Sequence, residues 1–202
     1  MRTYLPIIAF VVAAAIPPSG LAAENPTALK LVREVCSKCH GQEGLSPSSL
    51  VPHLAGQQAV YLDNQLRQFR NRGRSDPHAQ SQMWGIAGPL SNADIKAVAE
   101  HYAAKPPPPP QPSDRPPLLE KGKAIAQDGV DARDIPACLS CHGKLAKGMG
   151  PIPRLAGQHR DYLFRQIKDF RSSVREGDTM HENAKAITDE EAQALAIFFS
   201  SL

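Results

Sequence analysis

All four cysteines of this 202-residue chain lie in two short motifs with the same spacing. The motifs are Cys36-Ser37-Lys38-Cys39-His40 and Cys138-Leu139-Ser140-Cys141-His142. In a helix, two thiols at this spacing lie about one turn apart, so each can add across one vinyl group of the same porphyrin. The histidine that follows presents its imidazole to the iron, and Cys-x-x-Cys-His is the attachment pattern of c-type haem. The sequence therefore predicts two haem c groups, each bound covalently by its own pair of cysteines.

Three other uses of paired cysteines compete with this interpretation. Disulfides form in oxidising compartments, which an exported chain would enter. A thioredoxin-like redox pair needs a βαβ context, which this sequence does not indicate. A zinc ribbon needs its two cysteine pairs closer together than the roughly 100 residues that separate them here. Because a histidine follows both pairs and no cysteine lies elsewhere, haem attachment is the favoured interpretation.

Each iron also needs axial ligands, which decide whether it transfers electrons or binds a substrate. His40 and His142 are the predicted proximal ligands. Met83 and Met180 occupy matching places, each eight residues before the residue that caps the last helix of its half. A lone methionine usually fills a core, but two at equivalent places indicate ligands. The sequence thus predicts His/Met coordination at both irons.

Other side chains compete for the distal positions. His181 follows Met180 directly and is the strongest competitor, whereas His78 lies five residues before Met83 and is a weaker one. Met149 lies seven residues after His142, so we expect it in a loop beside the haem rather than at the opposite face.

A second layer of contacts around the proximal histidines is also predicted. An iron-bound imidazole normally donates its free N–H to a carbonyl, which fixes the ring. Pro52 and Pro153 follow the two motifs at matching places, so their carbonyls are candidate acceptors. The alternative is that these prolines only shape a turn.

The chain repeats itself. Residues 51–57, Val-Pro-His-Leu-Ala-Gly-Gln, recur as residues 152–158, Ile-Pro-Arg-Leu-Ala-Gly-Gln. Further matches pair Tyr61-Leu62 with Tyr162-Leu163 and Phe69-Arg70 with Phe170-Arg171. An offset near 100 residues indicates duplication of a whole haem domain rather than a small stacking unit.

A proline-rich segment separates the copies. Five consecutive prolines begin at Pro106, and three more follow by Pro117. Such a segment favours extended polyproline geometry and makes a semi-rigid spacer, although proline-rich segments also serve as recognition ligands. We predict domains at 24–105 and 118–202, joined by a linker at 106–117.

Both halves show helical patterns. Apolar residues recur at helical spacing in 29–36, 62–69 and 163–174. The final helix of each half begins with a polar run, Ser91-Asn92-Ala93-Asp94 or Thr188-Asp189-Glu190-Glu191, that resembles a capping box. Because no convincing alternating strand is present, the predicted fold class is all-α.

The N-terminus has the pattern of an export signal. A basic start precedes ten apolar residues at 7–16, and a small-residue cleavage site ends near Ala23. Ten apolar residues are too few to span a bilayer. We therefore predict a signal peptide at 1–23 and a periplasmic mature protein. The formal net charge of +3 does not call for a nucleic-acid partner.

Taken together, these motifs resemble the two-haem cytochrome c4 family over residues 28–202. The resemblance includes the Ile135-Pro136-Ala137 approach to the second haem motif and the segment from Met83 to Ile95. It implies two tandem class I cytochrome c domains of approximate twofold symmetry, with haems close together and His/Met ligands. The chain departs from the family in its longer proline run and its Met180-His181 context.

The resemblance also implies a function, which is electron delivery in a respiratory chain. We expect an electron-transfer protein rather than an enzyme, with a quinol-oxidising or dehydrogenase complex upstream and a terminal oxidase downstream. Any association with a membrane is expected to be peripheral, through these partners. One alternative is an electron-transfer subunit, like that of flavocytochrome c sulfide dehydrogenase. Another is a two-haem enzyme with one labile iron ligand.

Overall fold

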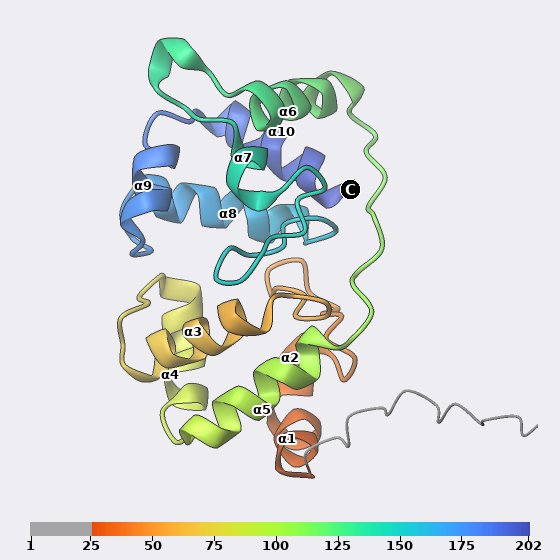
Figure 1. Cartoon of the computed structure of the whole chain (residues 1–202), viewed down its shortest axis with the longest axis vertical. Helices are drawn as coiled ribbons and strands as arrows, with labels where there is room; N and C mark the ends of the chain where they lie inside the picture. Colours follow the sequence, from red (N-terminus) through yellow and green to blue (C-terminus); the bar gives the residue numbers. More distant parts are fainter. Residues whose placement is uncertain (1–25) are drawn as a thin grey trace, which may run out of the picture.

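The computed structural model describes residues 26–202, so the predicted export signal at 1–23 lies outside the described residues. The described chain is helical, and its only β pairing consists of two isolated bridges, Val130 to Ile135 and Met149 to Ile152. This confirms the predicted all-α class. No helix in this range has the length and apolar character needed to cross a membrane. Figure 1 shows the helices gathered in two groups along the long axis of the molecule.

The two groups have a similar order of helices. The first half comprises α1 (Pro26–Leu31), η1 (Val32–Cys36), α2 (Ser37–His40), α3 (Ala59–Arg70), α4 (Pro77–Ala87) and α5 (Asn92–Ala103). The second half comprises α6 (Pro116–Asp128), η2 (Asp131–Arg133), α7 (Cys138–His142), α8 (Arg160–Arg171), α9 (Asp178–Ala184) and α10 (Asp189–Ser200). Helices α3, α4 and α5 thus correspond to α8, α9 and α10.

The last helix of each half lies at the centre of a core. Helix α5 packs against α1 and α3, and α10 packs against α6 and α8. Tyr102 and Leu195 are among the most deeply buried side chains on these two helices. Gly122 lets α6 approach α10 closely, because a Cβ there would lie 2.0 Å from the carbonyl oxygen of Ala194.

Both final helices begin with the predicted capping boxes. At α5, Asp94 N–H donates to Ser91 Oγ at 3.1 Å, and Ser91 N–H donates to the Asp94 carboxylate at 2.9 Å. Thr188 and Glu191 make the same pair of bonds at α10. These contacts satisfy backbone donors that a helix start would otherwise leave unpaired.

The linker is shorter at its C-terminal end than predicted. Pro116 and Pro117, which the sequence placed in the spacer, form the first turn of α6. Proline is tolerated there because first-turn N–H groups have no intrahelical partner. The remaining segment runs along one side of the molecule from α5 to α6 (Figure 1). It is packed rather than loose, since Pro108 is buried and Gln111 N–H donates to the Ser200 carbonyl at 2.8 Å.

Candidate functional site

The two Cys-x-x-Cys-His motifs lie in short helical segments at equivalent places. In the first half the motif ends the continuous helical stretch of α1, η1 and α2, and in the second half it forms α7. Gly41 and Gly143 end these segments with φ values of +76° and +81°, a conformation that glycine adopts without strain. Each motif therefore presents two thiols and one imidazole from about one helical turn, as the sequence predicted.

The two thiols of each pair differ in exposure. Cys36 and Cys138 are half-buried, whereas Cys39 and Cys141 are exposed. Burial raises the pKa of the Cys36 and Cys138 thiols to about 11, so both are neutral near pH 7. All four cysteines are free thiols, and the disulfide alternative has no counterpart in the structure.

The imidazoles of His40 and His142 are fixed by the predicted carbonyls. His40 Nδ1 lies 3.0 Å from the Pro52 carbonyl oxygen, and His142 Nδ1 lies 2.9 Å from that of Pro153. A carbonyl oxygen only accepts, so each Nδ1 carries the proton and each Nε2 keeps its lone pair. Burial lowers the pKa of both imidazoles, against the opposing effect of the carbonyl bond, and so favours the neutral form. Neutral, oriented imidazoles fit an iron ligand.

The two methionines lie on equivalent helices. Met83 is on α4 and Met180 is on α9, and both side chains are half-buried. Helix α4 packs against α3, and α9 packs against α8. The two helices share one place in each half, but ligation of the irons by their thioethers stays a prediction. Met149 lies in the loop after α7 and is 74% exposed.

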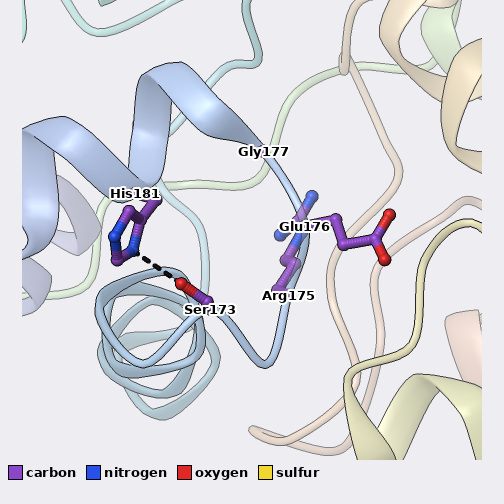
Figure 2. A pocket seen from close by; sticks show the side chains of 5 residues that line it. All are labelled: Ser173, Arg175, Glu176, Gly177 and His181. Carbon is purple, nitrogen blue, oxygen red and sulfur yellow. Dashed lines mark hydrogen bonds between the residues drawn. The ribbon is translucent and has the colours of Figure 1, made fainter.

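The two competing histidines, His181 and His78, have surroundings different from those of the methionines. His181 Nδ1 lies 2.9 Å from the Phe170 carbonyl oxygen and 3.0 Å from Ser173 Oγ. Figure 2 shows this ring beside Ser173 in a pocket that Arg175, Glu176 and Gly177 also line. Because the carbonyl accepts the Nδ1 proton, the ring is anchored to the end of α8. His78 is exposed near the start of α4.

Between the halves lies a contact surface that the sequence analysis missed. Arg74 and Arg175 are buried there, and each donates to both Gln65 and Gln166. Although burial opposes ionisation, the paired Arg74 holds the pKa of Asp76 below its usual value. The repeat matches these arginines and glutamines across the halves, a signal that could have indicated a symmetric interface.

Two histidines without counterparts also meet at this interface. The His53 and His159 rings stack with centroids 3.7 Å apart. The Ser46 backbone bridges them, because its N–H donates to His53 Nδ1 at 2.9 Å and its carbonyl lies 3.0 Å from His159 Nε2. Both histidines therefore form part of the contact between the halves.

Comparisons with known proteins agree with this geometry. A family model for cytochrome c matches residues 119–202. A cytochrome c-552 from Acidithiobacillus ferridurans is 35% identical to this chain, covering 100% of the chain and 88% of the relative. A thiosulfate dehydrogenase electron acceptor from Thiomonas intermedia is 36% identical, covering 89% of the chain and 81% of the relative. The solved structure of a cytochrome c4 from Acidithiobacillus ferrooxidans matches with a TM-score of 0.78 at 37% identity, covering 83% of this chain and 98% of that one.

Proposed function

This chain belongs to the dihaem cytochrome c4 family, and on that premise we propose that it is a periplasmic electron-transfer protein with two covalent haem c groups. The observation that carries the proposal is the duplicated proximal site. In each half, a Cys-x-x-Cys-His helix presents a buried imidazole whose Nδ1 is tied to a proline carbonyl. One such site would serve one haem, and this chain has two.

The residues of the site fit the group they would hold. Cys36 and Cys39 would form the two thioether bonds in the first half, and Cys138 and Cys141 would form those in the second. His40 and His142 offer Nε2 to the iron, since their Nδ1 protons are engaged. When bound, haem supplies a one-electron Fe(II)/Fe(III) couple.

The proposed distal ligands determine the kind of function. Thioethers from Met83 and Met180 would occupy the remaining coordination positions and leave no place for a substrate. Fixed imidazoles and unchanging ligands suit single-electron transfer, because little has to rearrange when the charge changes. We therefore propose a carrier that passes electrons to a terminal oxidase or another respiratory partner. Export through the signal at 1–23 is part of the proposal.

The test is the replacement of each methionine. Met83→Ala or Met180→Ala should leave haem attached but open one ferrous iron to carbon monoxide. Met149→Ala is the matched control, because Met149 is exposed and is not a proposed ligand. Spectra recorded under carbon monoxide report the outcome. Ready binding of carbon monoxide at both haems of the wild-type protein would overturn the proposal.

A second candidate function is electron acceptance from a thiosulfate-oxidising dehydrogenase, as a bound subunit or a dedicated acceptor. It is favoured by the similarity to a thiosulfate dehydrogenase electron acceptor. Purification from the native host tests the bound form, since a stable co-purifying dehydrogenase indicates a subunit. Reduction of the purified protein by a thiosulfate-oxidising dehydrogenase tests the dedicated acceptor. A two-haem enzyme would instead show a high-spin iron and turnover with peroxide or thiosulfate.

A further inference from the structure

One peptide group in the first half makes hydrogen bonds through both its carbonyl and its N–H. The carbonyl of Pro52 and the N–H of His53 belong to the same peptide bond. Its oxygen accepts the Nδ1 proton of His40 at 3.0 Å, within the first half. Its N–H donates to Oε1 of Gln158, in the second half, at 2.8 Å. A single amide thus connects the proximal histidine of one half to a side chain of the other.

The second half repeats the arrangement in the opposite direction. The carbonyl of Pro153 accepts the Nδ1 proton of His142 at 2.9 Å. The N–H of Arg154, on the same peptide bond, donates to Oε1 of Gln57 at 2.7 Å. The connections are therefore crossed, because each proximal histidine is linked to the glutamine of the opposite half.

Each glutamine is held rigidly in this role. Gln158 Nε2 donates to the His53 carbonyl at 2.9 Å, and Gln57 Nε2 donates to the Arg154 carbonyl at 3.0 Å. Each Oε1 also accepts the N–H of the residue that follows its own, which fixes the orientation of the side-chain amide. Gln57 is 7% exposed and Gln158 is 5% exposed. Water therefore has little access to replace either side chain.

Hydrogen bonds at the N–H and at the carbonyl of one amide strengthen each other. Donation from the N–H increases the negative charge on the carbonyl oxygen, most strongly where the surroundings exclude water. A more negative oxygen draws the Nδ1 proton more strongly and makes the imidazole a better electron donor to a metal. A more strongly donating imidazole favours the oxidised iron.

We propose that Gln57 and Gln158 are positioning residues that couple the reduction potential of each haem to the docking of the opposite half. Gln57 lowers the potential of the haem held by His142, and Gln158 lowers that of the haem held by His40. The inference rests on the proposed function, since it requires both histidines to bind haem iron. Gln57 and Gln158 are the last residues of the Pro-x-Leu-Ala-Gly-Gln motif in the two halves.

The test compares three glutamine variants of the haem-loaded protein. At a fixed applied potential, Gln57→Ala should raise the ratio of reduced to oxidised haem in the second half severalfold. A tenfold change corresponds to 59 mV for one electron. Gln158→Ala should act in the same way on the first-half haem. Gln58→Ala is the matched control, because Gln58 Nε2 also donates across the interface, to the Lys147 carbonyl at 2.8 Å, but contacts neither proline peptide.

Two readouts identify which haem responds. Spectroelectrochemical titration gives both potentials, and NMR of the reduced protein gives the Nδ1–H resonances of His40 and His142. In Gln57→Ala, the chemical shift of the His142 Nδ1–H should change as expected for a weaker hydrogen bond. The chemical shift of the His40 Nδ1–H should not change. If Gln57→Ala does not fold, Gln57→Glu retains the acceptor for Arg154 N–H and should leave the potential unchanged or lower it.

The outcomes separate this inference from the proposed function. Equal shifts at both haems, a shift in the same half as the mutation, or a shift no larger than that of Gln58→Ala would overturn the crossed coupling. Failure of haem attachment, or ready carbon monoxide binding in the wild type, would instead overturn the proposed function. If the irons are six-coordinate and the potential changes only at the haem of the half opposite the mutation, both the crossed coupling and the proposed function are supported.

Discussion

Glu191 makes two kinds of interaction at the start of α10. Its carboxylate caps the helix through Thr188 N–H and also accepts two bonds from the Arg133 guanidinium, at 2.5 and 2.9 Å. The Arg133 bonds, opposed by burial and assisted by Thr188, lower the pKa of Glu191 to about 2. One side chain thus joins the loop at η2 to the central helix of the second half.

We predict that Glu191→Gln destabilises the protein by about 1–3 kcal/mol near pH 7, the range for losing bonds to a charged group. The folded pKa lies below the ordinary value of 4.5, so this stabilisation is complete above pH 4.5 and is lost as the pH falls toward 2. Urea unfolding of wild type and variant at several pH values measures the difference.

Asp94→Asn is the control for that experiment, because Asp94 occupies the same cap position in α5 but is only half-buried, whereas Glu191 is buried. Its removal should cost less, about 1 kcal/mol or below. A difference between wild type and Glu191→Gln that stays constant from pH 7 to pH 2.5 would contradict the assigned role of the ion pair.

Some contacts of the candidate site could be predicted from the sequence, and others could not. The contacts of His40 and His142 with the Pro52 and Pro153 carbonyls follow from spacing, because each contact joins residues about a dozen positions apart. Gln57 and Gln158 act across the interface, over 97 to 105 residues of chain. Their repetition was visible in the sequence, but their partners depend on how the halves dock.

At the scale of elements, the linker is held against the loops that carry the repeated motif. Gly157 has φ +74°, and its N–H donates to the Phe199 carbonyl at 3.0 Å. A Cβ at this position would lie 2.7 Å from the Pro108 carbonyl oxygen. Gly56 has the equivalent geometry beside Pro107. Glycine is required at these places for both its left-handed conformation and the space it leaves.

We predict that Gly157→Ala destabilises the protein by more than the roughly 1–2 kcal/mol of a left-handed alanine, because it also displaces the linker. Gly150→Ala is the matched control, since Gly150 has φ +58° but open space around its Cα. Thermal unfolding of both variants gives the comparison. Equal losses of stability would show that the linker does not press on this loop.

The sequence predicted some elements better than others, for a physical reason. Helices α3, α5 and α8 bury one face in a core, so their apolar residues recur at helical spacing, whereas α10 is buried continuously from Ala194 to Ser200. Helix α4 has little such pattern and leaves Ile86 exposed, so its helical state was not predicted. The predicted linker includes the first two residues of α6, because proline is common both in linkers and in first helical turns.

At the scale of the whole molecule, the two halves meet through polar groups that match across an approximate twofold axis. Arg74 and Arg175 reach both Gln65 and Gln166, and Gln57 mirrors Gln158. Asp76 breaks the match, because Gly177 occupies the equivalent place. Local patterns cannot predict such a surface, since buried arginines are unusual and their partners lie in the other half.

The stacked histidines make the contact between the halves sensitive to acid. Burial, together with the charge of His159, lowers the pKa of His53 from 6.5 to about 4. His53 Nδ1 accepts the Ser46 N–H at 2.9 Å, so protonation of that nitrogen would break the bond. Contact with His159 of the other half is one cause of the lowered pKa, so docked halves bind this proton less readily than undocked halves do. Docking therefore weakens as the pH falls between these values and is unaffected by His53 above them.

We predict that the His53 and Arg154 amides lose hydrogen-exchange protection over this window, by at most about tenfold per pH unit for one linked proton. These amides are the ones that donate to Gln158 and Gln57, so their protection reports docking directly. His53→Gln keeps an acceptor for Ser46 but cannot titrate, and its protection should depend less on pH. An equal decline in wild type and variant would assign the acid sensitivity to another group. If the crossed glutamine coupling also holds, undocking by acid should raise both haem potentials together, whereas Gln57→Ala raises only one.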